Sequence, residues 1–491
     1  MSDQYLKISR QVIVNYLALF VSFVFGPVSM FLLTRNLSVA DYGVYSILSI
    51  TVTVITIILD LGFPYYIVAR LSGVEHKTKK NAFSSIFYFE FFIILALILV
   101  FIFSPLKHFV LTILKLSNYS IEFDICLFVI LASLLIRIIN SYLASEKKLE
   151  LQALSNMLQQ GLWVILLLAF FLIIKKINLT SVMIFWLLGM IITTLLGLFL
   201  VRSSINNKFS NDSVKKAIGF SAPLILFNIG TWLIISAGRY ALNQYSTLEN
   251  VAYYSFAFSL ISLISSLATA ISGTLYPYFA EAWNANGNHS IFLNASIKYT
   301  LIVVLPCISV LFALNKQIIM TISTVKYLAA APIVLFLLLV PLFSALNYIF
   351  TQQLLLKGKT AFLGITHLFV AFFNIILIVP LVKSYGAYGA AISTTLAYFL
   401  LFSFIITRLI NKIRLNFKYL KIFRIISISI ILLVSLMFIK PEGTLPIILS
   451  LIFSMILYLI LLIILGVLNE EKKIILSYLK SIKDRIYSLI F

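Results

Sequence analysis

Residues 122–144 read EFDICLFVILASLLIRIINSYLA. After Asp124, Arg137 is the single charged residue of this stretch. A helix needs about 20 mostly apolar residues to cross the hydrocarbon core of a bilayer, so this stretch predicts a membrane-spanning helix with an arginine inside it. Comparable apolar stretches recur along the chain, bounded by charged residues or by Pro, Gly and Asn. We expect fourteen such helices, at residues 11–34, 41–63, 83–104, 122–144, 154–174, 180–201, 217–239, 250–280, 296–314, 328–356, 361–381, 386–408, 421–440 and 445–468.

The composition excludes a soluble globular protein. Of the 491 residues, 62% are hydrophobic and 11% are charged, whereas soluble domains carry about 25% charge. We therefore expect an all-α polytopic membrane protein. Cys126 and Cys307 lie in apolar runs and the four histidines lack metal-ligand spacing, so neither a disulfide framework nor a metal site is predicted. The N-terminus shows no cleavable signal, so the first span is expected to remain in the mature protein.

The positive charge of the chain is unevenly distributed between the loops. Lys and Arg sum to 37 against 16 Asp and Glu, a formal net charge of +21. With the N-terminus in the cytoplasm, 26 of these cations fall on the inner side and 10 on the outer side, and Arg137 lies within a span. This bias follows the positive-inside rule and predicts that both termini are cytoplasmic. The net charge is therefore attributed to topology, and nucleic acid is not an expected partner.

Two segments of the chain resemble each other. DYGVYSILSI, from Asp41, is similar to NVAYYSFAFSL, from Asn250, and each follows a span that ends near an arginine. Such a repeat fits a transporter with two six-helix lobes around a central cavity. We expect one lobe at residues 1–213, a second at 214–415, helices 13 and 14 at 416–469, and an amphipathic cytoplasmic tail at 470–491. The tail fits either the inner membrane surface or a site on other cytoplasmic loops.

No catalytic motif is present: the chain has no phosphate-binding glycine loop, no HExxH and no GxSxG. The candidate functional groups are instead ionisable residues at membrane depth. Arg137, with Asn140 and Ser141 on the same helical face, is suited to bind a diphosphate inside a cavity, although an arginine there can also extend to the inner interface. Arg35 and Arg239, at the outer ends of repeat-related spans, are further cavity candidates with the same alternative.

Two acids and one histidine are candidates for ion coupling. Asp60 in ILDLGFPYY precedes a glycine and a proline, which can break a helix and expose carbonyls to a cation, and Glu90 lies in FYFEFFII. Either acid can bind Na⁺ or H⁺, or pair with an arginine as a structural ion pair. His367, with Asn374 seven residues later on the same face, can titrate near neutral pH or serve only as hydrogen-bonded structure. No cofactor is predicted beyond a coupling Na⁺ or H⁺.

These segments resemble a known family. The chain is similar to the polysaccharide-biosynthesis flippases of the multidrug/oligosaccharidyl-lipid/polysaccharide exporter superfamily, and specifically to Wzx-type O-antigen or capsule repeat-unit flippases. The resemblance covers roughly residues 10–410 and rests on LLTRNLSVADYGVYSILS, LDLGFPYYIVARLS, GFSAPLILFN, GRYALNQYSTLENVAYYSFAFSL, GTLYPYFAEAW and VAFFNIILIVPLVKSYGAYGAAISTTLAYFL.

The resemblance implies twelve core helices in two lobes plus two C-terminal helices, opening alternately to each side of a bacterial cytoplasmic membrane. It implies an undecaprenyl-diphosphate-linked oligosaccharide as substrate, membrane lipid as surroundings, and a polysaccharide polymerase and chain-length machinery as partners. Ser38 and Gly238 depart from the family pattern, and Gly238 replaces the acid that often precedes the second-half arginine. The alternatives are a lipid II flippase, a drug/cation antiporter or, from a different class, a membrane glycosyltransferase or polymerase. The short exterior loops argue against this last alternative.

Overall fold

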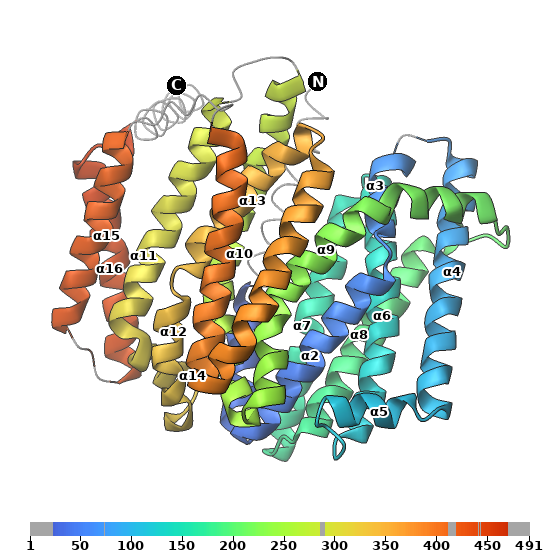
Figure 1. Ribbon diagram of the computed structural model, residues 1–491, viewed down its shortest axis with the longest axis horizontal. Helices are drawn as coiled ribbons and strands as arrows, with labels where there is room; N and C mark the ends of the chain where they lie inside the picture. The colour runs from blue at the N-terminus through green and yellow to red at the C-terminus, as the bar shows by residue number, and fades with distance from the viewer. Residues whose placement is uncertain are drawn as a thin grey trace, which may run out of the picture.

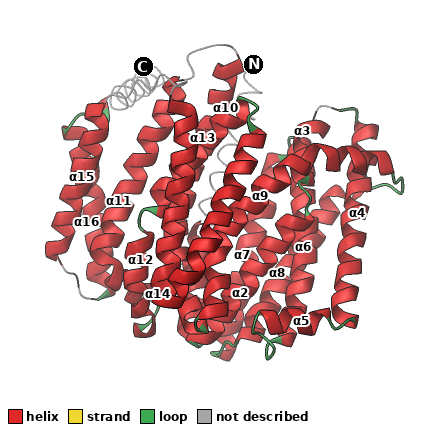
Figure 2. Cartoon of the chain, in the orientation of Figure 1, coloured by secondary structure: helices red, strands yellow, loops and turns green. Residues whose placement is uncertain are grey.

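The structure is a computed structural model that describes residues 23–72, 74–284, 290–410, 419–439, 441 and 443–469. Within these ranges every regular element is a helix, and the connections are short loops (Figure 2). This confirms the all-α prediction. After a first helical segment at residues 23–36, the elements are α2 (Val39–Leu59), α3 (Phe63–Leu71), α4 (His76–Phe103), α5 (Leu106–Ile113), α6 (Ser120–Ser145), α7 (Leu149–Ile174), α8 (Leu179–Val201), the 3₁₀ helix η1 (Arg202–Ser204), α9 (Asn211–Tyr245), α10 (Leu248–Asn284), α11 (Ser290–Ile322), the 3₁₀ helix η2 (Val325–Ala330), α12 (Ala331–Leu337), α13 (Val340–Leu356), α14 (Thr360–Ile410), α15 (Tyr419–Ile439) and α16 (Thr444–Ile464).

The helices divide into two groups along the long axis of the molecule (Figure 1). Helices α4, α6 and α8 lie towards one end and α11, α15 and α16 towards the other, with α9 running obliquely between them. Helix α2 packs against α10, so the two helices that carry the similar sequence segments lie side by side. The expected boundary at residues 213–214 falls in the first turn of α9. The N-terminal residues and the predicted tail at 470–491 lie outside the described residues.

The described part of the chain contains ten helices that are long and apolar enough to cross a membrane, or eleven with the bent pair Val325–Leu337 and Val340–Leu356 as one span. The sequence predicted fourteen, and three features account for much of the difference. Helix α14 is counted once, although its 51 residues would measure about 76 Å at 1.5 Å per residue, and the non-helical Gly386 (φ 54°, ψ −130°) divides it at the boundary between the predicted spans 361–381 and 386–408. Residues 11–22 of the first predicted span lie outside the described residues. Helix α6 covers the predicted span 122–144, but it is largely buried and is not one of the ten helices counted here.

The surface is apolar where the helices face outward. Exposed side chains include Phe103, Ile173 and Phe438, which keep 82%, 79% and 83% of their accessible surface. Such surface is unfavourable in water and matches lipid hydrocarbon. The protein is therefore a multi-pass membrane protein.

Helix ends follow local sequence signals. Ser38 caps α2 by accepting a hydrogen bond from the backbone N–H of Asp41, and Asn178 forms a capping box with Ser181 at the start of α8. The predicted span 41–63 is shorter than expected because α2 ends at Leu59. Leu61 and Gly62 then adopt left-handed φ angles of 45° and 72°. The break that Gly62 and Pro64 predicted is thus present, immediately after Asp60.

Candidate functional site

A cavity of about 650 Å³ lies in the N-terminal half of the molecule. This volume is within the range of small-molecule binding sites. Among the described residues, the wall contains one charged side chain, that of Arg137, together with amides, hydroxyls and three of the four tryptophans of the chain. The lining residues are Phe25, Gly26, Ser29, Tyr45, Val52, Thr53, Thr56, Ile57, Pro64, Ser133, Arg137, Asn140, Ser141, Asn156, Gln159, Gln160, Trp163, Trp186, Met190 and Trp232.

Arg137 projects from α6 and keeps 36% of its side-chain surface exposed. Its Nη2 donates to Oδ2 of Asp60 at 2.5 Å, and the Asp60 side chain is fully buried. Asn140 and Ser141 line the same cavity, as their helical spacing predicted. The guanidinium of Arg137 thus faces the cavity while it is paired with the buried carboxylate of Asp60.

The break after α2 places Asp60 and occupies its oxygens. Oδ1 of Asp60 accepts the backbone N–H of Gly62 at 2.8 Å, so both carboxylate oxygens have partners. The carbonyl of Gly62 accepts the Ser221 hydroxyl at 2.9 Å, and the carbonyl of Asp60 accepts the N–H of Phe63. The carbonyls that were expected to face a cation are therefore engaged within the protein.

Glu90 lies midway along α4 and is 2% exposed. Asp60 and Arg137 both act electrostatically on it, so the structure brings together three residues that lie far apart in sequence. Neither carboxylate oxygen of Glu90 has a hydrogen-bond partner in the described part of the chain, and the same is true of Nε of Arg137.

Helices α7 and α8 supply a polar and aromatic part of the cavity wall. Nδ2 of Asn140 donates to Oδ1 of Asn156 at 2.9 Å, which joins α6 to α7. Tryptophan faces provide flat apolar surfaces, and amides provide both donors and acceptors. This combination suits a polar, uncharged ligand such as a sugar.

Sequence reasoning missed this amide and tryptophan wall, although a signal existed. Asn156, Gln159, Gln160 and Trp163 follow one another at helical spacing in LSNMLQQGLW, and all four line the cavity. A polar stripe that ends in a tryptophan within a predicted span therefore indicates which side of α7 faces a cavity.

The other two predicted arginines lie outside this cavity lining. Arg35 is exposed; its Nη2 donates to the Thr321 carbonyl at 3.0 Å and its Cζ lies 4.3 Å from the centre of the Phe31 ring. Arg239 is 9% exposed and its Nε donates to the Ser255 hydroxyl at 3.1 Å. The cavity roles of both remain predictions.

Gly238 has a packing reason for replacing the acid of the family pattern. A Cβ on Gly238 would lie 2.6 Å from the Tyr254 ring, whose hydroxyl hydrogen-bonds to that of Thr394 at 2.8 Å. The aromatic ring occupies the space that an aspartate side chain would need.

His367 and Asn374 are buried in α14 and have different partners. Nδ1 of His367 lies 2.8 Å from the Leu363 carbonyl, and Oδ1 of Asn374 accepts the Ser393 hydroxyl at 2.6 Å. Gly230 allows α9 to approach closely, since a Cβ there would lie 2.7 Å from the backbone of His367. The hydrogen bonds of His367 and Asn374 join parts of the helical fold. The ion-coupling role of the two residues remains a prediction.

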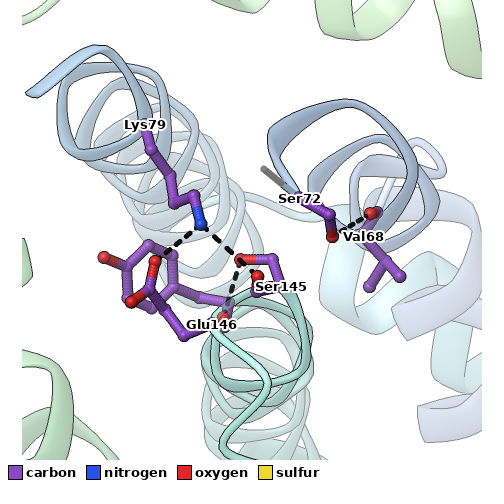
Figure 3. Close-up of polar contacts among 6 residues, drawn as sticks. Val68, Ser72, Lys79, Ser145 and Glu146 are labelled. Carbon is purple, nitrogen blue, oxygen red and sulfur yellow. Dashed lines mark hydrogen bonds and ion pairs between the residues drawn. The ribbon is translucent and has the colours of Figure 1, made fainter. Parts of the chain in front are cut away.

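Another ion pair joins α4 to the end of α6, near the predicted cytoplasmic ends of both helices (Figure 3). Nζ of Lys79 lies 2.6 Å from Oε1 of Glu146 and 3.4 Å from the Ser145 carbonyl. Burial alone would raise the pKa of Glu146, but the hydrogen bond and charge of Lys79 lower it, with smaller contributions from His76 and Lys148.

Comparison with known proteins gives three kinds of similarity. Residues 8–283 match the family described as polysaccharide biosynthesis protein. The uncharacterized membrane protein MJ1068 of Methanocaldococcus jannaschii is 28% identical over 280 residues, and the match spans 52% of each chain, about half the length of that relative.

Among solved structures, the lipid II flippase MurJ in an inward closed conformation has a TM-score of 0.76 at 18% identity, covering 92% of this chain and 99% of that one. An inward-facing multidrug resistance MATE family transporter of the MOP superfamily has a TM-score of 0.58 at 14% identity, covering 81% of this chain and 94% of that one. The fold is therefore that of MurJ and the MATE transporters.

Proposed function

Because the chain belongs to the polysaccharide biosynthesis protein family and has the fold of MurJ and the MATE transporters, we propose that it flips an undecaprenyl-diphosphate-linked oligosaccharide. The cargo moves from the cytoplasmic to the outer leaflet by alternating access, and its sugars are those of O-antigen or another surface polysaccharide. The family and the structural neighbours are flippases and transporters, not enzymes. The chain itself is therefore expected to make or break no covalent bond.

The observation that carries the proposal is the composition of the cavity wall. Arg137 supplies one guanidinium for a diphosphate, and Trp163, Trp186 and Trp232 supply ring faces for sugars. A site for cationic drugs would instead be lined by acids, and none of the described lining residues is acidic. This favours the oligosaccharide flippase over the drug/cation antiporter.

Transport is expected to be coupled to an ion gradient. Moving one charge across 100 mV is worth about 2.3 kcal/mol, and Asp60 and Glu90 lie where an ion would act on Arg137. We place the protein in a bacterial cytoplasmic membrane with both termini in the cytoplasm. There it would deliver its cargo to a polysaccharide polymerase and chain-length machinery.

A reconstituted flipping assay tests the proposal. Vesicles with the purified protein would carry undecaprenyl-diphosphate-linked disaccharide with a fluorescent label on the sugar, and dithionite outside would quench molecules that reach the outer leaflet. We expect flipping above that of empty vesicles, and a loss of about 10- to 100-fold in Arg137→Ala, since a charge-assisted contact is worth about 1.5–3 kcal/mol.

Trp283→Phe is the matched control, because Trp283 is the one tryptophan outside the cavity lining. It should flip the labelled lipid at the wild-type rate. Equal rates in Arg137→Ala and wild type would contradict the proposed site. Flipping of labelled lipid II, with no flipping of the disaccharide lipid, would instead establish the lipid II alternative.

A further inference from the structure

Glu90 is a buried acid without a compensating contact. It lies at the middle of α4 with 2% of its surface exposed, and both of its oxygens lack a hydrogen-bond partner in the described ranges. An ionised carboxylate in such a place is costly, and buried acids respond by taking up a proton. By contrast Glu122, also buried, accepts the Thr180 hydroxyl at 2.5 Å.

The charges around Glu90 come from two helices. Asp60, at the end of α2, and Arg137, on α6, both act on it, and Tyr65 on α3 interacts with the same pair. Among the other charged side chains on the helices against α4, Glu122 of α6 is buried and accepts the Thr180 hydroxyl, and Arg239 of α9 is buried and donates to Ser255. The rest are exposed or paired. Exposed are Arg70, Arg202, Asp212, Lys215 and Lys216; paired are Lys107 with Asp124 and Lys79 with Glu146.

We propose that Glu90 is a proton-binding site that controls how strongly Arg137 binds the diphosphate of the cargo; the second half of this inference rests on the proposed function. Glu90, Asp60 and Arg137 form one charged cluster. With Glu90 protonated, the charges of Asp60 and Arg137 cancel and the cluster is neutral. Without that proton the cluster has one net negative charge directly behind the cavity, where an anionic diphosphate would be repelled.

The unpartnered Nε of Arg137 gives the deprotonated state a structural basis. Nε is buried and has no acceptor in the described part of the chain, while Glu90 has two oxygens without donors. A deprotonated Glu90 would attract the Arg137 guanidinium, whose charge acts on it, and a guanidinium shared between two carboxylates attracts a third anion less strongly. By linkage, diphosphate binding favours proton uptake at Glu90 to the same extent that protonation favours diphosphate binding.

A proton fits this cluster better than Na⁺ does. A metal cation needs several oxygen ligands, and both oxygens of Asp60 are engaged by Gly62 and Arg137. The carbonyl of Gly62 accepts Ser221, and the guanidinium repels a second cation. Within the described residues no group of three or more His, Cys, Asp or Glu residues could hold a metal ion.

The first test needs no substrate. Infrared difference spectra of the full-length protein in lipid nanodiscs, between mildly acidic and alkaline buffer, report the C=O stretch of protonated carboxylic acids. We expect a band at acidic pH that is lost at alkaline pH, absent in Glu90→Gln and retained in Glu122→Gln. Asp60→Asn, which keeps Glu90, should lose the band at lower pH, because the negative neighbour is gone and Arg137 is free to pair with Glu90. Absence of any Glu90-dependent band would overturn the proton site.

The second test adds undecaprenyl diphosphate and follows tryptophan fluorescence, since three of the four tryptophans line the cavity. Affinity in wild type should fall about 5- to 150-fold from acidic to alkaline pH, the range of ordinary coupling between sites. Glu90→Gln should bind with the residual pH dependence of the lipid alone. The same dependence in wild type and Glu90→Gln would overturn the link to Arg137. A Glu90 band without diphosphate binding at any pH would support the proton site and contradict the proposed cargo.

Discussion

Arg137 and Arg239 are both arginines of the transmembrane region, one in each predicted six-helix lobe, and their surroundings are opposite. Arg137 is paired with Asp60 at 2.5 Å and presents its guanidinium to a cavity. Arg239 is 9% exposed, donates to the neutral Ser255, and lies with its Cζ 5.1 Å from the centre of the Phe258 ring. Around it lie the tyrosines Tyr42, Tyr240, Tyr254 and Tyr398, which carry no charge to pair with it.

The difference shows what a charge at membrane depth can be used for. A guanidinium with an acid behind it can face a cavity and exchange contacts with a ligand, because its charge is already compensated. A guanidinium enclosed by aromatic rings is held by packing, and it has no lining position in the cavity. The Arg137 region is thus suited to reversible binding, and the Arg239 region to holding α2, α9 and α10 together.

The largest effect should come from removing the acid at the Arg137 site. Asp60→Ala leaves the guanidinium unpaired, which for a buried pair costs about 3–5 kcal/mol; we expect about 3 kcal/mol because Arg137 keeps 36% of its side-chain exposure. Chemical unfolding in detergent would measure the loss. The double variant Asp60→Ala/Arg137→Ala should recover part of it, and simple additivity of the two single changes would show that the pair does not stabilise the fold. Asp124→Ala is the control, since its pair with Lys107 is more exposed.

The second-largest effect is expected from disturbing the packing of α2 against α10, near Arg239. A Cβ on Gly43 of α2 would lie 2.2 Å from the Leu248 carbonyl oxygen at the start of α10. Gly43→Ala must therefore separate these helices, and overpacking of this kind costs about 1–3 kcal/mol. Gly219→Ala is the matched control, because no heavy atom lies within 4 Å of its added Cβ and alanine gains about 0.5–1 kcal/mol in a helix. An unchanged melting temperature in Gly43→Ala would show that α2 and α10 are loosely packed.

A smaller effect is expected at the Lys79–Glu146 pair, about 16 Å from Glu90 along α4. The folded-state pKa of Glu146 is lowered, so it lies below the value of about 4.3 in an unfolded chain. The pair therefore stabilises the protein above that pH, and the contribution is lost as the pH falls through the folded-state value. Lys79→Met should lose about 1 kcal/mol at neutral pH and nothing in strong acid, whereas Lys77→Met, on the exposed face, should match wild type at both. A loss independent of pH would assign Lys79 a packing role alone.

The smallest effect is expected at Arg239 itself. Its Nη1 is buried without a partner in the described residues, so the side chain pays a desolvation cost that a methionine would avoid. We expect Arg239→Met to change the free energy of unfolding by less than about 1 kcal/mol and to leave flipping near the wild-type rate. A loss of flipping as large as that of Arg137→Ala would remove the distinction between the two arginines and place Arg239 in the transport path.

Much of the helical frame followed from the sequence. The apolar stretches predicted the spans because a bilayer core demands about 20 apolar residues and internally paired backbone. The face shared by Arg137, Asn140 and Ser141 followed from helical periodicity, and the break after Asp60 followed from Gly62 and Pro64. The boundary predicted between spans 361–381 and 386–408 coincides with Gly386, where α14 loses helical backbone geometry.

The partners of these residues did not follow from the sequence. Asp60 and Arg137 are 77 positions apart. Nothing in either segment specifies that α2 and α6 pack so that these two side chains meet. The sequence by itself determined that this chain crosses a membrane many times with an arginine at depth, because hydrophobicity and periodicity are local properties. Only the tertiary structure decided which arginine is backed by an acid, which is enclosed by tyrosines, and that Glu90 shares the first site, because these depend on how separate helices pack.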